Sequence, residues 1–163
     1  MRKVLVIAND AVPYPGLPVS GSGLRAWGLG EGLRSRGHDV RYAMPAESVP
    51  EGTMLAGPDA PLLYHGPDFP EVVRAAAADV LVFQHWPRVG GAADLDVPIA
   101  LDLHGPLLVE TAFQRRADAD FAEMVRVKLD AFRRADFVSC AGEHQRRYFL
   151  PWLLLAGRDV TGE

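Results

Sequence analysis

The chain has 163 residues, of which 48% are hydrophobic and 23% are charged, and its formal net charge is −4. This length supports one well-buried core and is short for two ordinary domains, so we expect a single domain over residues 1–163. The negative charge balance gives no electrostatic reason to expect a nucleic acid or an anionic membrane as a partner, because binding either one requires a basic face. Cys140 is the single cysteine, which excludes an intrachain disulfide and a thiolate metal cluster and fits a reducing cytoplasm.

The first predicted element is a strand at residues 4–8, where VLVIA is a continuous apolar run rich in β-branched residues. Such a run suits a strand that is covered on both faces in a parallel sheet, and we expect it to be the central strand. A helix is expected at 24–36, with Gly37 at the position of a left-handed C-cap. A second strand at 39–44 follows, and the Pro- and Gly-rich segment 45–61 is expected to be an irregular loop.

The rest of the chain repeats this alternation of strands and helices. It comprises predicted strands at 62–64, 79–84, 98–103 and 136–141, and predicted helices at 69–78, at 118–134 and from Glu143 onward. Strands that alternate with helices indicate a parallel sheet with right-handed crossovers. The predicted fold class is therefore α/β, a Rossmann-like doubly wound parallel sheet with three αβα layers. Ligands of such sheets bind beyond the carboxyl ends of the strands, where the strand order reverses.

The sequence GSGLRA, which begins at Gly21, fits the G-x-G-x-x-G/A pattern of dinucleotide-binding turns. The first strand ends near Asn9, however, and a dinucleotide turn follows its strand directly. The second strand also lacks an acidic residue at its end to hold the ribose hydroxyls, which argues against NAD. Gly21 and Gly23 could instead let a helix N-terminus approach a phosphate closely, or Ser20 or Ser22 could simply cap the helix.

Charged and polar residues follow the later strands. Arg25, in the first turn of the predicted helix, opposes the helix dipole, which indicates a role in pairing or in ligand binding. His85 follows a strand directly, so it either lines the cleft or forms a hydrogen bond at the strand end. Asp102 and His104 are two residues apart and point to the same side, so the carboxylate is expected to raise the pKa of His104 and to orient its ring. These residues lack the spacing of a metal site, and no metal is expected.

Several segments occur in an order that resembles glycosyltransferase family 4, whose enzymes have the GT-B fold. They are KVLVI at 3–7, GSGLRAW at 21–27, RGHDV at 36–40, ADVLV at 78–82, VPIALDLHG at 97–105 and ADFVSCAGE at 135–143. The resemblance covers nearly the whole chain. It implies the N-terminal, acceptor-side domain of a retaining, metal-independent transferase, which uses a nucleotide-sugar donor as its substrate and requires no other cofactor.

The resemblance also implies where substrates bind. The glycine loop would approach the donor diphosphate or the acceptor, and His104 would form a hydrogen bond with the donor sugar. Asp102 stands where relatives often carry a small hydroxyl residue, so its partnership with His104 is inferred from this sequence alone. The expected site residues are His104 and Asp102 as the catalytic pair, and Gly21, Ser22, Gly23, Arg25, His85 and Glu143 as substrate- or donor-binding residues.

In this family a second Rossmann-like domain binds the nucleotide, and the sequence ends before such a domain begins. We therefore expect this chain to be inactive alone and to be completed by a donor-binding domain in the same polypeptide or in another chain. The alternatives are a non-catalytic Rossmann-like ligand-binding module and a small nucleotide-binding protein. The expected location is the cytoplasm, with the inner face of the membrane as an alternative.

The final segment, 148–157, is apolar almost all round and contains Pro151, which is expected to kink a helix. We expect this segment to pack in the core. If part of it instead packs on a missing domain, its exposed apolar surface would favour a homodimer.

Overall fold

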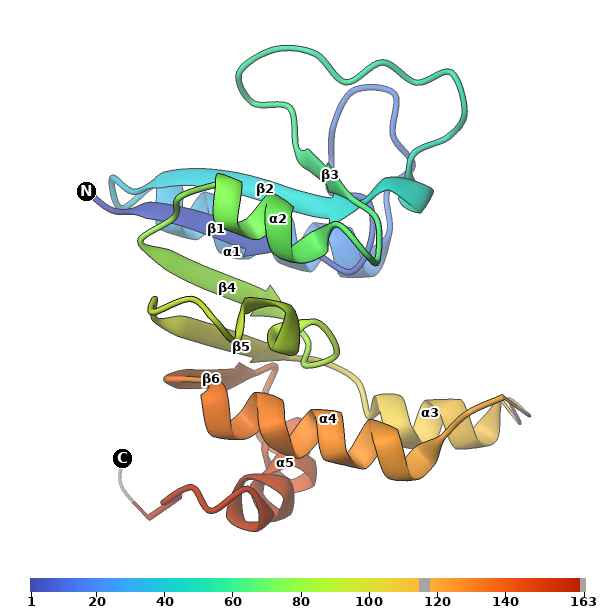
Figure 1. Ribbon diagram of the computed structural model, residues 1–163, viewed down its shortest axis with the longest axis vertical. Helices are drawn as coiled ribbons and strands as arrows, with labels where there is room; N and C mark the ends of the chain where they lie inside the picture. The colour runs from blue at the N-terminus through green and yellow to red at the C-terminus, as the bar shows by residue number, and fades with distance from the viewer. Residues whose placement is uncertain (115–117, 162–163) are drawn as a thin grey trace.

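A parallel sheet of six strands lies at the centre of the computed structural model, which describes residues 1–114 and 118–161 (Figure 1). The spatial order is β3-β2-β1-β4-β5-β6, so the order reverses between β1 and β4 and the predicted central position of the first strand is confirmed. The strands are β1 (Lys3–Ile7), β2 (Asp39–Pro45), β3 (Leu62–Tyr64), β4 (Val80–Gln84), β5 (Ile99–Leu103) and β6 (Phe137–Cys140).

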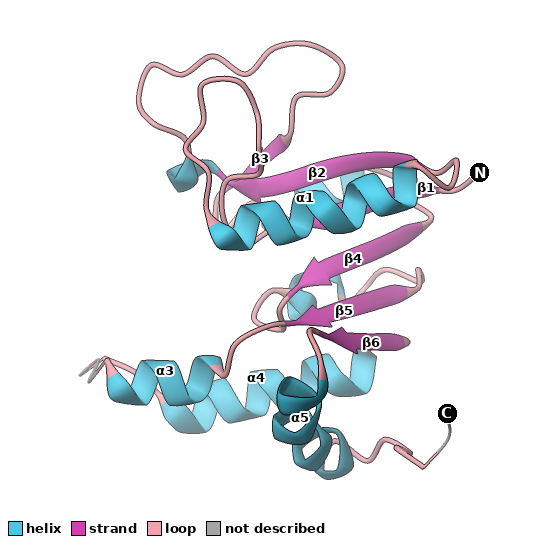
Figure 2. Ribbon diagram, turned by 180° about the vertical axis from the view of Figure 1, so that it is seen from behind, coloured by secondary structure: helices cyan, strands magenta, loops and turns pink. Residues whose placement is uncertain are grey.

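Helices cover both faces of this sheet. They are α1 (Gly21–Arg34), α2 (Phe69–Ala75), α3 (Leu107–Phe113), α4 (Phe121–Arg134) and α5 (Glu143–Leu155). Helices α2 and α4 lie on one face, α1 lies on the other face beside β2, and α5 packs against α4 near the edge strand β6 (Figures 1 and 2). The predicted fold class, an α/β Rossmann-like doubly wound sheet between helical layers, is confirmed.

The alternation of side chains along the strands divides the core between the two faces. In β1, Leu5 and Ile7 join the apolar cluster under α2 and α4, while Val4 and Val6 join the cluster under α1. Each of these four side chains is at most 5% exposed. A strand that is apolar at every position is therefore explained by burial on both faces, as expected for a parallel sheet.

Two helices begin at other residues than predicted, because capping side chains fix where they start. Helix α1 begins at Gly21, three residues earlier than expected, because the Ser20 hydroxyl accepts a hydrogen bond from the Gly23 N–H at 2.9 Å. Gly37 adopts a φ of +84° just after α1 ends, as predicted for its C-terminal turn. Helix α4 begins at Phe121 instead of residue 118, and helix α3 was not predicted.

Helix α5 begins at Glu143 as predicted and continues through Pro151. The expectation that the apolar segment packs in the core is wrong for its end, because Leu154 is 57% exposed and Leu155 is 66% exposed. Phe149 is the buried residue of this helix. Tyr148, Trp152 and Leu153 of the same helix are partly buried against the core, and Arg158, just after the helix, donates hydrogen bonds to the carbonyls of Phe132 and Ala135. None of the helices in the described part of the chain has the length and apolar character needed to cross a membrane.

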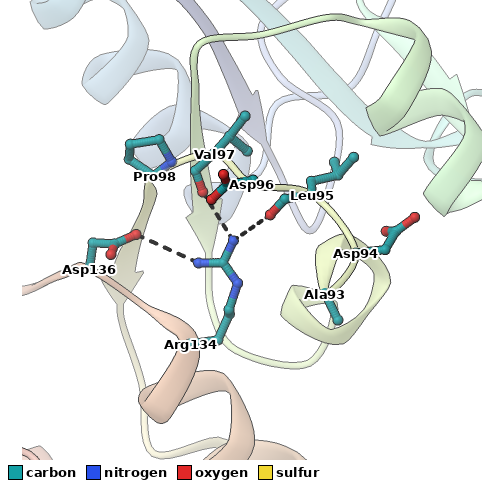
Figure 3. Close-up of a pocket in the computed structure, with 8 residues that line it drawn as sticks. All are labelled: Ala93, Asp94, Leu95, Asp96, Val97, Pro98, Arg134 and Asp136. Carbon is teal, nitrogen blue, oxygen red and sulfur yellow. Dashed lines mark hydrogen bonds and ion pairs between the residues drawn. The ribbon is translucent and has the colours of Figure 1, made fainter.

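A polar hollow of about 410 Å³ lies at the amino-terminal end of β5 (Figure 3). Arg134, the last residue of α4, donates hydrogen bonds to the carbonyls of Leu95 at 2.6 Å and Val97 at 3.1 Å, and it lies 3.7 Å from the carboxylate of Asp136. These bonds fix the end of α4 to the segment that leads into β5. The hollow is at the opposite end of the strands from the predicted site, and its arginine already has structural partners.

Candidate functional site

The candidate site lies at the carboxyl ends of β1, β4, β5 and β6, where the sheet order reverses. In open α/β sheets this is the edge at which ligands bind, because the loops on either side of the reversal separate. The N-terminus of α1 lies at the same edge, because this helix follows β1 along the chain.

Gln84, the last residue of β4, joins three elements at this edge and was missed by the sequence analysis. Its side chain is 1% exposed. The amide oxygen accepts hydrogen bonds from the Asn9 N–H at 3.0 Å and from the Ser22 hydroxyl at 3.2 Å, and the amide nitrogen donates to the Ser22 carbonyl at 2.5 Å. Gln84 thus holds the end of β1 and the first turn of α1 to the end of β4. One glutamine at a strand end carries no sequence signature that could have indicated this role.

The two glycines of the predicted loop have different surroundings. A Cβ atom on Gly23 would lie 1.7 Å from the carbonyl oxygen of Ala11, so the backbone of α1 approaches the preceding loop as closely as only glycine allows. A Cβ atom on Gly21 would meet nothing within 4 Å. The packing of the chain therefore explains Gly23 without any ligand, whereas Gly21 lies at the helix N-terminus next to open space. Ser20 is the cap, and the Ser22 hydroxyl is bonded to Gln84.

Arg25 forms a bidentate ion pair with Asp102, which is the pairing role that its position in the first turn of α1 indicated. The distances are 2.6 Å from Nε and 2.7 Å from Nη2 to the two carboxylate oxygens. The Ser139 hydroxyl donates a third hydrogen bond to the same carboxylate at 2.7 Å. The hydrogen bonds to Asp102 raise the pKa of Arg25. This network ties α1, β5 and β6 together at the candidate site, and its carboxylate is 2% exposed.

His104 is not oriented by Asp102, and the expectation of a raised pKa is wrong. Burial lowers the pKa of His104 below its ordinary value of 6.5, and the nearby Arg25 cation adds to this effect, outweighing the opposite effect of the Asp102 charge. The Asp102 carboxylate accepts its hydrogen bonds from Arg25 and Ser139 instead. The Nδ1 atom of His104 is buried and has no hydrogen-bond partner among the described residues. A neutral, half-buried imidazole with an unpaired nitrogen can donate or accept one further hydrogen bond.

His85 contacts His104 and is buried, with 5% of its surface exposed. The two rings meet edge to face with centroids 5.1 Å apart. Burial first, and then the neighbouring His104 and Lys128, lower the pKa of His85 to about 3, so its ring is neutral at pH 7. Its Nδ1 atom accepts a hydrogen bond from the Trp86 N–H at 3.1 Å, and its backbone has a φ of +80°. His85 therefore packs against His104 and has little exposed surface of its own.

Glu143 is the first residue of α5 and lies on the surface. Its carboxylate pairs with Arg147 at 3.0 Å and with Arg146 at 3.5 Å, both within the same helix. The structure brings Gly21, Ser22 and Arg25 together with Asp102, but gives Glu143 no contact with them. No group of three possible metal ligands occurs within residues 1–114 and 118–161.

An apolar groove of about 410 Å³ lies between α1 and the strands β4, β5 and β6, and its lining includes Asp102 and Ser139. Gly28 and Gly32 form its helical wall, and a Cβ atom on either would meet nothing within 4 Å. Phe137, at the opposite wall, is 63% exposed. The ion-paired network therefore borders an open apolar surface as well as the cleft edge.

Comparison with known proteins gives matches to solved structures. No protein-family model matches the chain, and no curated protein matches its sequence. The structure of a sucrose-phosphate synthase from Thermosynechococcus elongatus is similar, with a TM-score of 0.70 and 15% identity over 94% of this chain and 45% of that chain. An alpha-glucosyltransferase in complex with UDP and a 13-mer DNA is also similar, with a TM-score of 0.52 and 11% identity over 85% of this chain and 37% of that chain.

These likenesses establish the fold. Both neighbours are glycosyltransferases, and this chain spans less than half of the length of each. More particularly, the Rossmann-like sheet described above is the fold that this chain shares with part of a sucrose-phosphate synthase. The DNA in the second structure belongs to that enzyme, and the expectation that this chain has no nucleic-acid partner stays a prediction.

Proposed function

We propose that this chain is the N-terminal, acceptor-side domain of a retaining GT-B glycosyltransferase that uses a nucleotide-sugar donor. The observation that carries the proposal is the likeness to a sucrose-phosphate synthase over 94% of the chain. The location of the polar residues supports it, because Ser22, Arg25 and His104 all lie at the edge of the sheet where the strand order reverses. A donor-binding domain, in the same polypeptide or in another chain, completes the enzyme, and the acceptor is unknown.

In this proposal His104 is the residue that contacts the donor sugar. Its imidazole is neutral at pH 7, since burial lowers its pKa, and its Nδ1 atom has no hydrogen-bond partner among the described residues. It is therefore suited to form a hydrogen bond with a sugar hydroxyl and unsuited to act as a cationic acid. His85 is a positioning residue, because its ring packs edge to face against that of His104.

Gly21 and Ser22 are the residues proposed to lie near the diphosphate. They begin α1, whose first N–H groups carry the positive end of the helix dipole, and Gly21 leaves open space beside them. Arg25 and Asp102 are proposed to act by holding this helix in place, because their charges are paired with each other. Asp102 is thus proposed as a positioning residue, and Glu143 as a residue at the outer rim of the cleft.

A non-catalytic ligand-binding module is the second candidate, and one observation favours it. Of the two glycines in the G-x-G pattern, Gly23 is explained by its packing against Ala11 and needs no ligand. Such a module would keep the same sheet and the same helix N-terminus without transferring a sugar. The two candidates differ in whether a protein that contains this domain transfers a sugar at all, and the first candidate further requires that this activity falls when His104 is replaced.

The direct test is a titration of the isotope-labelled chain with UDP-glucose, followed by NMR. We expect weak, millimolar binding, with shifts at Gly21, Ser22 and His104 and none with NAD. The His104→Ala variant should lose the shifts at the loop, whereas His144→Ala, a change at an exposed histidine of α5, should keep them. Tight binding of NAD, or loop shifts that persist in the His104→Ala variant, would contradict the proposed site.

A further inference from the structure

Glu110, in the first turn of α3, places its carboxylate against the loop that carries His104. Helix α3 follows β5 along the chain, so this loop lies at the carboxyl edge of the sheet (Figure 2). A Cβ atom on Gly105, the residue after His104, would lie 2.9 Å from one carboxylate oxygen of Glu110 and 3.6 Å from the other. The carboxylate therefore lies against the backbone of this loop, in the space that a side chain at position 105 would need.

Helix capping does not explain this position of the carboxylate. A glutamate near the start of a helix can fold back to accept a hydrogen bond from the N–H of the N-cap residue. The N-cap of α3 is Pro106, which has no N–H, and no side chain caps this helix. Within the part of the chain that the structure describes, no ion pair or hydrogen bond engages the carboxylate of Glu110. Its two oxygens are free to accept hydrogen bonds from a ligand.

His104 supplies a second free hydrogen-bonding group next to this carboxylate. Its Nδ1 atom is buried without a partner in the described structure. Glu110 is near enough to act electrostatically on the imidazole, although burial outweighs this effect and keeps the pKa of His104 lowered. The Asp102 carboxylate, in contrast, already accepts hydrogen bonds from Arg25 and Ser139. The loop after β5 thus presents a neutral imidazole together with an unpaired carboxylate.

This pair of groups is suited to hydroxyls and unsuited to anions. An ionised carboxylate only accepts hydrogen bonds, and its two oxygens can accept them from two hydroxyls of one sugar ring. The same negative charge repels a carboxylate or a phosphate carried by that ring. The N-terminus of α1, at the same edge of the sheet, has the opposite character, because it carries the positive end of the helix dipole. A ligand with an anionic part and a neutral, hydroxyl-bearing part matches this edge.

We propose that Glu110 is a sugar-binding residue, which selects a neutral sugar by accepting hydrogen bonds from its hydroxyls beside His104. The inference rests on the proposed function, because it takes His104 as the residue that contacts the donor sugar. It adds the class of sugar that the site takes. A neutral hexose is bound, and a hexuronic acid is disfavoured.

The test is an NMR titration of the isotope-labelled chain with UDP, UDP-glucose and UDP-glucuronic acid, which carries a carboxylate in place of the C6 alcohol of glucose. UDP alone measures any long-range effect of charge on the diphosphate, so the affinity of each sugar nucleotide is taken relative to that of UDP. The wild type should prefer UDP-glucose to UDP-glucuronic acid by roughly three- to tenfold, as expected for like charges at an exposed site.

Glu110→Gln keeps the size of the side chain and removes its charge. Relative to UDP, this variant should bind UDP-glucose roughly three- to tenfold more weakly than the wild type does, because a charged acceptor is lost. Its preference for UDP-glucose over UDP-glucuronic acid should largely disappear. Glu71→Gln is the matched control, since Glu71 is also an exposed residue in the first turn of a seven-residue helix, α2, which follows the opposite edge strand β3. The control should behave as the wild type.

The outcomes separate this inference from the proposed function. The role of Glu110 is overturned if Glu110→Gln keeps the relative affinities of the wild type, or if the wild type binds both sugar nucleotides equally, while the loop shifts still depend on His104. Loop shifts that persist in His104→Ala contradict the proposed function, and the inference about Glu110 then fails with it. Loss of sugar binding in Glu71→Gln as well would show that the charge of a helix start, and not contact with the sugar, is responsible.

Discussion

Replacing Arg25 by methionine should lower the free energy of unfolding by about 2–4 kcal/mol. The change leaves the Asp102 carboxylate, which is 2% exposed, with Ser139 as its remaining side-chain partner. It removes two hydrogen bonds between charged groups, at 2.6 Å and 2.7 Å, each worth about 1.5–3 kcal/mol. The side chain of Arg25 is 28% exposed, so water that enters in its place offsets part of this sum.

The assay is urea unfolding of the chain at pH 7, compared with an exposed ion pair in the same protein. Arg126→Met is the control, because Arg126 pairs with Glu123 and their side chains are 63% and 49% exposed. The control should cost at most about 1 kcal/mol. For a chain of this size each kcal/mol corresponds to roughly 2–4 °C in melting temperature, so the Arg25 variant should melt roughly 5–15 °C lower.

A double replacement, Arg25→Met with Asp102→Leu, separates the loss of the pair from the exposure of a buried charge. Replacing both partners of a buried ion pair by apolar residues is often close to neutral, whereas removing one partner is not. The double variant should therefore be more stable than Arg25→Met alone. If Arg25→Met costs no more than Arg126→Met, or if the two replacements simply add, the network does not hold α1 to the sheet as described.

Four further variants test individual contacts by urea unfolding. Gly23→Ala should lower the free energy of unfolding by about 3 kcal/mol or more, because its Cβ would lie 1.7 Å from the Ala11 oxygen. Gly21→Ala should stay within about 1 kcal/mol of the wild type. Equal effects of the two changes would refute the packing role of Gly23. The pKa of His85 is about 3 in the folded chain and 6.5 ordinarily, so the wild type loses stability as the pH falls below 6.5. Between pH 7 and 4.5, His85→Asn should therefore lose about 2–3 kcal/mol less free energy of unfolding than the wild type loses. Tyr64→Phe removes a 2.7 Å hydrogen bond and should cost about 1 kcal/mol at pH 7. Burial raises the pKa of Tyr64 to about 12, so the wild type loses this advantage as the pH rises above 10, and a difference that stays constant to pH 11 would contradict the assignment.

The strands could be predicted from the sequence because their own residues are apolar enough to indicate burial. In β1 and β4 almost every residue is apolar, and a segment of that kind is stable only between two covering layers. Helix α3 could not be predicted in the same way, since only Leu108 and Thr111 of its seven residues are buried and no side chain caps it. Helix α1 was predicted to begin three residues too late and to end two residues too late, because its buried residues are Gly23, Ala26 and Gly30, which form no apolar stripe.

The contacts of the candidate site were harder to predict than its location. Strand ends indicated His85, Asp102 and His104 correctly as residues at the carboxyl edge of the sheet. Adjacency along β5 then suggested His104 as the partner of Asp102, whereas the actual partner, Arg25, is 77 residues away in the chain. The bonds of Gln84 likewise span 62 and 75 residues. Pairings over such distances depend on how α1 lies across the sheet, which no local pattern records.

The contact between Gly23 and Ala11 has a consequence for sorting related sequences. Because the backbone of α1 touches the preceding loop there, any protein with this arrangement must keep glycine at position 23, whether or not it binds a ligand. Position 21 is under no such packing restraint. A relative that retains Gly23 but carries a larger residue in place of Gly21 would share the architecture and give no sign of the activity, so position 21 is the more informative of the two when function is assigned across a family.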